Sequence, residues 1–200
     1  MPSSTRSQFL DVAEALFAER GFYGVSIAAI ADELGLTKQA LLHHFKSKPK
    51  LYAEVLKRIS DRFAAMDILV STPDLDARGQ LVSYMTGLCQ ATRERPQQTQ
   101  LLMRELLDNQ RRAETAETWY LKPFLQSLID RLKAVPGWQS ISDEAALAHI
   151  YQWLGAINYY GISGPTLTGI FGASRYADYD AAFATALEGQ ICAVLDSRTS

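Results

Sequence analysis

Apolar residues recur along the chain at helical spacing over most of its length. Near the start, Phe9, Ala13 and Phe17 fall at positions i, i+4 and i+8, and so on one face of a helix. The sequence has no sustained alternation of β-branched and polar residues, which would mark strands. The pattern therefore predicts an all-α protein.

Helix-capping residues and helix breakers divide this pattern into about nine helices. Thr5 and Gln8 have the spacing of a capping box for the first helix, and Ser26 and Thr37 are the expected caps of the next two. Pro123 predicts a kink in the seventh helix. The predicted helices cover about residues 5–20, 27–34, 38–44, 48–70, 75–92, 96–109, 113–134, 143–160 and 178–197, with a loop at 161–177.

The composition is that of an ordinary globular protein. Its 200 residues are 48% apolar and 21% charged, which excludes a disordered tail or a collagen-like chain and allows one or two domains. No apolar run approaches the ~18 residues of a membrane span, and the first residues lack the apolar stretch of a secretory signal. Two cysteines far apart exclude a disulfide scaffold or a cysteine-based zinc module, so we expect a cytoplasmic protein with no membrane partner.

The formal net charge of −2 conceals an asymmetry between the two parts of the chain. Residues 1–60 carry a net charge of +2, and residues 61–200 carry one of −4. The segment from Thr37 to Ala53 contains four lysines and two histidines but no acid. This predicts a local contact with an anionic partner, although a solvated lysine face would show the same pattern.

Residues 26–45 have the pattern of a helix-turn-helix. Two short helices are joined by Gly35 and Leu36. Leu41 and Phe45 in the second helix can dock it against its neighbours, which leaves its polar residues for the major groove of DNA. The structural alternative is an antiparallel helix pair inside an ordinary bundle.

The polar residues of this segment divide between bases and phosphates. Lys38 and Gln39 are placed to reach base edges, the lysine for guanine and the glutamine for adenine. Thr37, Lys48 and the backbone N–H groups at the Ser47 cap are better placed for phosphates. The two histidines can take either role. The candidate DNA-binding residues are Thr37, Lys38, Gln39, His43, His44 and Lys48.

One stretch resembles the N-terminal domain of the TetR family of transcriptional repressors: FLDVAEALFAERGFYGVSIAAIADELGLTKQALLHHFKSKPKLYAEVL. The likeness covers about residues 5–58 and is carried by the FAERGF helix end, the S-I-x-x-I-A-x-x-L-G-L motif helix and the HHFKSK exit. It implies a three-helix DNA-binding domain, 1–50, and a helical effector-binding and dimerisation domain, 51–200. It also implies a homodimer that binds a double-stranded DNA operator and releases it when a small molecule binds.

Three residues depart from the usual pattern of that family. Leu42 stands where members usually have a tyrosine that touches the DNA backbone, so the resemblance does not predict that phosphate contact here. Gln39 replaces a common glycine and adds a polar side chain for contacts with the bases. Pro49 replaces a common acid. These departures leave the prediction of DNA binding in place.

The C-terminal part is predicted to bind a small molecule. Eight aromatic residues lie between 119 and 160, and pockets in helical bundles are mostly apolar with a few placed polar groups. We expect a largely apolar or aromatic effector; the alternative is that these rings simply form the core. The candidate ligand-binding residues are Trp119, Tyr120, Phe124, His149, Trp153 and Tyr159.

The last two predicted helices carry long apolar stripes, including Ile150, Ile157, Leu187 and Ile191. Small residues on the same helices allow close approach, so 142–160 and 178–197 are predicted to form an isologous four-helix interface in a homodimer. The alternative is that the stripes form the core of a single chain.

The sequence has no motif of an enzyme active site. A Gly-rich phosphate loop, an H-E-x-x-H motif and a nucleophile elbow are all missing, and its three histidines and two cysteines fit no metal pattern. We therefore predict a non-enzymatic, ligand-responsive repressor that needs no cofactor. The alternatives are a helical ligand-binding or scaffold protein that has lost DNA binding, and a DNA-binding protein that responds to no effector.

Overall fold

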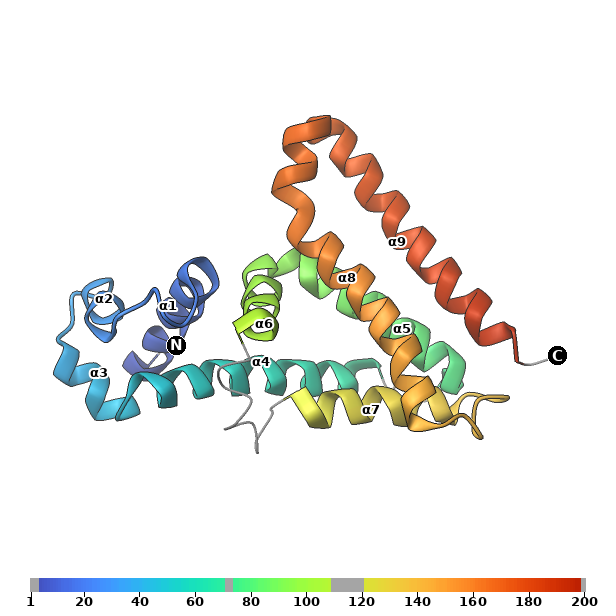
Figure 1. The fold of residues 1–200 in the computed structure, drawn as a ribbon, viewed down its shortest axis with the longest axis horizontal. Helices are drawn as coiled ribbons and strands as arrows, with labels where there is room; N and C mark the ends of the chain where they lie inside the picture. Colours follow the sequence, from blue (N-terminus) through green and yellow to red (C-terminus); the bar gives the residue numbers. More distant parts are fainter. Residues whose placement is uncertain (1–3, 71–73, 109–120, 199–200) are drawn as a thin grey trace. The chain divides into compact units, whose positions relative to one another are not determined.

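The computed structural model describes residues 4–70, 74–108 and 121–198, and over these residues it is built from helices (Figure 1). This part of the chain contains nine helices and no strand, so the prediction of an all-α fold is confirmed. The helices are α1 (Thr5–Arg20), α2 (Ile27–Asp32), α3 (Lys38–Phe45), α4 (Lys48–Val70), α5 (Ala77–Glu94), α6 (Pro96–Asp108), α7 (Leu121–Ala134), α8 (Asp143–Phe171) and α9 (Ala173–Asp196).

Short polar residues cap the first helices, with one correction to the prediction. Ser26 and Thr37 cap α2 and α3 as predicted, each accepting a hydrogen bond from the backbone N–H three residues further on. At α1 the predicted capping box of Thr5 and Gln8 is wrong, because Ser4 is the cap and accepts from a backbone N–H at 3.3 Å. The hydroxyl of Ser4 takes the cap position one residue earlier, so Thr5 is the first residue of α1.

The predicted loop at 161–177 is wrong. Helix α8 continues through Pro165 to Phe171, and only Gly172, with φ of 83°, separates it from α9. Packing against α9 compensates for the glycines and the proline: the ring of Tyr160 stacks on Phe183 with centroids 3.9 Å apart. Helix breaking is a local tendency, and tertiary contacts along two antiparallel helices outweigh it here.

Residues 109–120 lie outside the part that the structure describes, and the predicted start of a helix at 113 lies among them. Pro123 is the third residue of α7, so a kink between 113 and 134 depends on residues outside the described ones.

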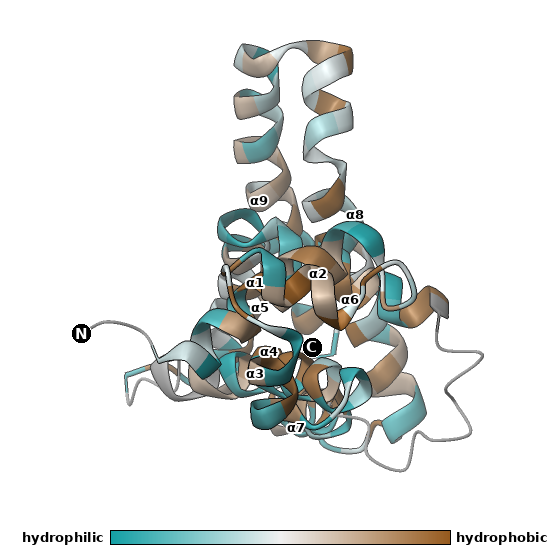
Figure 2. Cartoon of the chain, turned by 90° about the vertical axis from the view of Figure 1, so that its left-hand side faces the viewer, coloured by the Kyte–Doolittle hydropathy of each residue, from teal (hydrophilic) through white to brown (hydrophobic). Residues whose placement is uncertain are grey.

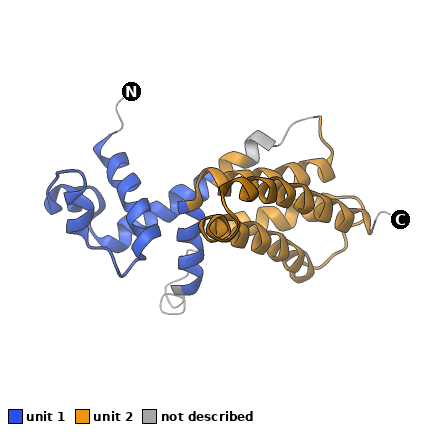
Figure 3. Cartoon of the chain, turned by 90° about the horizontal axis from the view of Figure 1, so that it is seen from above, with its two compact units in different colours: residues 1–62, 97–120 blue, residues 63–96, 121–200 orange. Residues whose placement is uncertain are grey.

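The chain divides into two compact units (Figure 3). Unit 1 comprises residues 1–62 and 97–120, and unit 2 comprises residues 63–96 and 121–200. This division reflects which residues pack together and does not assign a function to either unit. The division of function at residue 50 stays a prediction.

The core of unit 2 is formed by α5, α7, α8 and α9 around Trp138. Trp138 is 1% exposed, and its Nε1–H donates a hydrogen bond to the carbonyl of Leu195 at 3.0 Å. This bond ties the loop after α7 to the end of α9, because a buried indole N–H needs a partner.

The apolar stripes of α8 and α9 lie largely in this core. Ile150, Ile157, Leu187 and Ile191 are all buried within the single chain. The structure therefore assigns these residues to the interior of one chain and not to a surface that could meet a second copy. The other members of the two stripes are only partly buried against this core: Leu147, Leu154, Phe183 and Val194. The homodimer interface predicted at 142–160 and 178–197 stays a prediction.

The hydroxyl of Tyr160 carries a testable consequence for stability at high pH. The oxygen is buried and has no hydrogen-bond partner among the described residues. Burial, followed by the charge of Asp180, raises the pKa of Tyr160 to about 12. Because this pKa is above that of a tyrosine in the unfolded chain, the folded state holds the proton longer, and the free energy of unfolding should fall as pH rises from about 10 to about 12.

Tyr160→Phe is expected to remove this part of the pH dependence. At neutral pH it should leave the free energy of unfolding unchanged or raise it by up to about 1 kcal/mol, because the hydroxyl that it removes had no partner. Urea unfolding of both proteins between pH 7 and pH 12 measures the difference. Tyr159→Phe, which removes a hydroxyl from a residue 72% exposed, is the matched control at neutral pH. A large loss of stability in Tyr160→Phe would show that the hydroxyl has a partner in solution.

Candidate nucleic-acid interface

Helices α2 and α3 in unit 1 form a helix-turn-helix. The turn between them uses Gly35 at φ of 63°, a conformation that side-chain-bearing residues rarely adopt. The N–H of Leu36 closes the turn by donating to the carbonyl of Ala31 at 3.0 Å. Leu41 and Phe45 are buried, so one face of α3 is fixed against the rest of unit 1 and the opposite face is left to solvent.

The candidate residues on α3 and its cap reach solvent from more than one side of the helix. Gln39 and His43 lie opposite the buried pair, whereas the ring of His44 lies beside that of Phe9, with centroids 5.9 Å apart. The five residues are all exposed: Thr37, Lys38, Gln39, His43 and His44. The hydroxyl oxygen of Thr37 accepts a hydrogen bond from the N–H of Ala40 at 3.2 Å, which leaves its hydroxyl proton free to donate. The two histidine rings lie with centroids 5.6 Å apart, at the C-terminal end of α3. The structure thus brings five of the six predicted residues onto one short helix and its cap.

Lys48 is placed differently from the other five. Its Nζ lies 4.5 Å from the centroid of the Phe22 ring, in a cation–π contact at the start of α4. Partial burial lowers the pKa of Lys48 below its usual value. Nothing in the spacing of the sequence indicated Phe22 as its neighbour, because the contact joins the loop after α1 to the first turn of α4.

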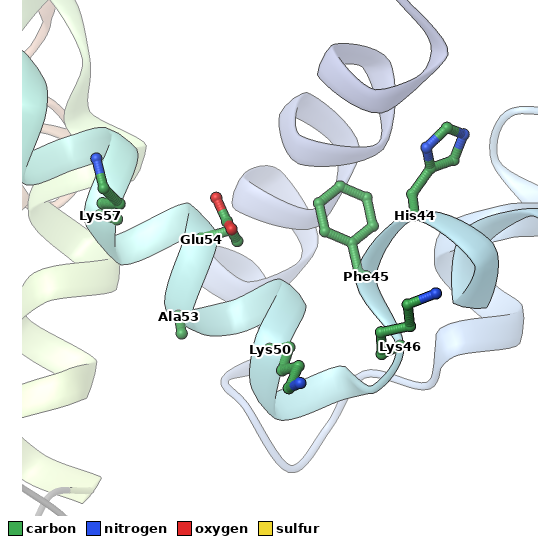
Figure 4. A pocket seen from close by; sticks show the side chains of 7 residues that line it. All are labelled: His44, Phe45, Lys46, Lys50, Ala53, Glu54 and Lys57. Carbon is green, nitrogen blue, oxygen red and sulfur yellow. The ribbon is translucent and has the colours of Figure 1, made fainter.

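The structure adds basic residues beyond the six that the sequence predicts. A pocket of about 280 Å³ lies where α3 passes into α4, and Figure 4 shows the side chains that line it. Its lining residues are His44, Phe45, Lys46, Lys50, Ala53, Glu54 and Lys57. Lys50 and Lys57 are seven residues apart on α4, and this helical spacing is the sequence signal that could have identified them together. Lys46 lies outside both helices, so no spacing indicated it.

Of the six candidate ligand-binding residues, the four that the structure describes do not converge on one site. His149 packs edge-on against Trp138, with ring centroids 5.1 Å apart, and lies beside Trp153. Phe124 instead stacks on Phe63 at 4.9 Å. Tyr159 is 72% exposed. Trp119 and Tyr120 lie outside the described residues. The ligand-binding assignment of all six stays a prediction.

Residues 9–55, which include the whole helix-turn-helix, match the family model of the bacterial regulatory proteins, tetR family. The chain belongs to the TetR family. All six candidate DNA-binding residues of this TetR-family chain lie inside the matched range.

Curated relatives of this TetR-family chain support the assignment. It is 34% identical over 84 residues to the transcriptional repressor KstR2 of Rhodococcus jostii, a match over 42% of this chain and 41% of the relative. It is 30% identical over 137 residues to the transcriptional regulator RutR of Escherichia coli O157:H7, over 68% of this chain and 62% of the relative. The chain therefore spans less than two-thirds of the length of these relatives.

The likeness of fold extends over nearly the whole TetR-family chain. The fatty acid degradation regulator FadR from Bacillus halodurans superposes with a TM-score of 0.71 over 96% of each chain, at 14% sequence identity. At that identity the match concerns the fold alone. The sequence match to RutR covers 137 residues, which is more than unit 1 contains, so the likeness in sequence extends beyond the helix-turn-helix.

The described residues show neither a membrane span nor a metal cluster. None of their helices is both long enough and apolar enough to cross a membrane. No group of three or more His, Cys, Asp or Glu side chains in this part of the chain is arranged to hold a metal ion.

Proposed function

We propose that this chain is a non-enzymatic transcriptional repressor of the cytoplasm, which binds a palindromic duplex operator as a homodimer and releases it when a small molecule binds. The observation that supports this most strongly is the arrangement of α3. Leu41 and Phe45 are buried beneath it, while Gln39 and His43 are exposed on its other side and Lys38 is exposed in its first turn. The Rhodococcus relative is named a transcriptional repressor, which favours repression over activation.

In this proposal the exposed face of α3 enters the major groove. Lys38 and Gln39 belong to the first turn of α3, which is the part of a recognition helix that usually contacts base edges. A two-fold dimer would present two such helices to successive major grooves, about 34–36 Å apart. Lys48 and the hydroxyl of Thr37 supply phosphate contacts that set the register.

The dimer is proposed to form through the outer face of α8 and α9, and this revises the residues involved. The small residues Gly155, Ala182, Ala186 and Gly189 are exposed, and Tyr151 is 47% exposed. Small residues allow two helices to approach closely, and exposed tyrosines add apolar area. Hydrophobic residues also continue to the far end of α8, where it meets α9 (Figure 2). The interface thus uses the predicted helices but not the buried stripes.

Release requires that the effector favours a protomer arrangement in which the two recognition helices no longer match the groove spacing. A coupling free energy of about 1–3 kcal/mol changes operator affinity about 5- to 150-fold. We propose a largely apolar or aromatic effector bound in unit 2, where the core is rich in aromatic rings.

Single substitutions in the interface separate base reading from phosphate binding. Gln39→Ala is expected to relax preference at one base position of the operator, with little change in the salt dependence of binding. Lys48→Ala should weaken binding to all duplexes alike and lower the slope of log affinity against log salt by about one for each phosphate that Lys48 neutralises in the wild type. Fluorescence anisotropy at about 50 to 200 mM salt, where such slopes are steep, measures both the base preference and the salt dependence of duplex binding.

The same assay tests the proposed function itself. A duplex from upstream of the chain's own gene should bind the wild type far more tightly than a scrambled duplex. Equal, weak binding to both would favour the alternative in which DNA binding has been lost, for which Leu42 is the motivating departure. A thermal-shift screen of apolar small molecules then tests the response to an effector, because a true effector stabilises the folded protein by mass action. If nothing in that screen shifts the melting temperature or releases the duplex, a DNA-binding protein without an effector is the better description.

A further inference from the structure

The pocket between α3 and α4 in unit 1 is strongly basic. Lys46 and Lys50 are exposed, and Lys57 and His44 complete the basic part of the lining. The chain as a whole has a net charge of −2, so such a concentration of cations is local. A concave site lined by one sign of charge raises the local concentration of the opposite charge.

The carboxylate in the pocket is already neutralised. Glu54 forms an ion pair with Arg6 of α1, with Nη2 and Oε2 3.1 Å apart. Arg6 is itself held over the ring of Phe45, 5.1 Å from its centroid, so it is anchored beside the pocket. Lys57 pairs with Asp61 at 2.7 Å, one turn further along α4. The side chains that remain to attract a ligand are therefore cationic, led by Lys46 and Lys50.

The backbone at Lys46 is strained in a way that a glycine would relieve. Lys46 has φ of 65° and ψ of −40°, the only non-glycine residue with positive φ among the described residues. The N–H of Ser47 donates to the carbonyl of Phe45 at 2.7 Å, so Lys46 is the central residue of a three-residue γ-turn. This form of the γ-turn is rare and costly for a residue with a side chain, and strain of this kind collects at functional sites. A lysine is held here at a conformational cost.

We propose that this pocket binds a phosphate group of the duplex backbone, outside the bases read by α3, with Lys46 and Lys50 as the contacting residues. Phosphate suits the site because lysines bind it as compact point charges and His44 can add a hydrogen bond. The proposal rests on the proposed function, since it extends the same interface beyond α3 and the α4 cap. It makes the strained backbone of Lys46 part of DNA binding.

The central test uses the full chain and three variants. Lys50→Gln is expected to weaken duplex binding about 3- to 10-fold and to lower the salt slope by about one for each protomer. Lys46→Gly should also weaken binding, yet raise the melting temperature by about 1–3 °C, because glycine adopts positive φ without strain. Lys122→Gln, an exposed lysine on α7 in unit 2, removes the same charge elsewhere and should change neither quantity.

The source of the phosphate is tested by two further arms. A scan of neutral methylphosphonate linkages should reveal one position outside the sequence read by α3 that weakens wild-type binding and leaves Lys50→Gln unaffected, the coupling expected of a direct contact. Inorganic phosphate, titrated to millimolar concentration and followed by ³¹P NMR, should bind the wild type no more tightly than it binds Lys50→Gln. Saturable phosphate binding that is abolished in Lys50→Gln, with an unchanged duplex salt slope, would assign the pocket to a free anion and overturn the proposal.

The remaining outcomes are also decisive. If the wild type binds its duplex specifically but Lys46→Gly and Lys50→Gln keep its salt slope, the pocket does not contact DNA and only this inference fails. If Lys46→Gly melts below the wild type, the strained lysine is not held for binding, and the inference fails as well. If the wild type binds no duplex specifically, the proposed function fails first and the phosphate site fails with it.

Discussion

Trp138→Ala is expected to lower the free energy of unfolding of unit 2 by about 3–5 kcal/mol. Trp138 is 1% exposed and lies in a core formed by α5, α7, α8 and α9. Truncation leaves a cavity and removes the hydrogen bond from Nε1 to the carbonyl of Leu195. It also removes the ring that lies under the guanidinium of Arg198, 4.7 Å away, and beside His149. Urea unfolding followed by circular dichroism gives the difference in unfolding free energy.

Two variants divide this effect into packing and hydrogen bonding. Trp138→Phe keeps an aromatic ring but leaves the Leu195 carbonyl without its indole donor, and should cost about 1–2 kcal/mol. Lys122→Ala, at an exposed residue of α7 in unit 2, should change stability by less than about 0.5 kcal/mol. If Trp138→Ala cost no more than Trp138→Phe, the tryptophan would not be the centre of this core. Duplex binding near neutral pH should survive in Trp138→Phe, since its contacts all lie in unit 2.

Glu14→Ala is expected to lower the free energy of unfolding of unit 1 by about 2–4 kcal/mol. Glu14 is 9% exposed and accepts hydrogen bonds from Arg58, from Arg62 at 3.1 Å and from Gln98 at 3.0 Å. It therefore joins α1 to α4 and α6 inside unit 1. Removing the carboxylate leaves two half-buried guanidinium groups without their main counter-charge, which costs more than the pair itself contributes.

The pH dependence of this network has a definite sign. Burial by itself raises the pKa of Glu14, but the hydrogen bond from Arg58, the charge of Arg62 and the hydrogen bond from Gln98 together bring the pKa below its usual value. A lowered pKa contributes stability that is present above the pKa of the unfolded chain, near 4.5, and is lost as pH falls through the folded value. The difference in unfolding free energy between wild type and Glu14→Gln should therefore be largest near neutral pH and shrink below about pH 4.

A neighbouring acid on the same helix supplies the control. Glu19 is exposed on α1, and Glu19→Gln should change the free energy of unfolding by less than about 0.5 kcal/mol at any pH. A pH-independent loss of stability in Glu14→Gln would show that shape, and not charge, accounts for its role. Equal stability of Glu14→Ala and wild type at neutral pH would contradict the network altogether.

The helix-turn-helix was predictable because its signals are local. Caps at Ser26 and Thr37 and a breaker at Gly35 lie within a dozen residues of one another, and each acts through its own backbone. Leu41 and Phe45 then had to be buried, so the exposure of Gln39 and His43 on the opposite side of the helix followed from the helical period. Lys38 has the spacing of the buried face and is exposed as the first residue of α3. The same argument failed at 161–177, where Gly161, Gly164 and Pro165 act as breakers locally but are outweighed by packing of α8 on α9.

From its sequence alone, this protein's all-helical class, its helix-turn-helix and the polar face of α3 are determined, because spacing, capping and periodicity are properties of neighbouring residues. Only the tertiary structure decided that the apolar stripes of α8 and α9 lie inside one chain, that Lys48 lies over Phe22, and that a strained Lys46 faces a pocket with Lys50. The first two are contacts between segments that are distant in the sequence, and the third depends on a single backbone angle. Their energies come from packing and burial, which no pattern of neighbouring residues specifies.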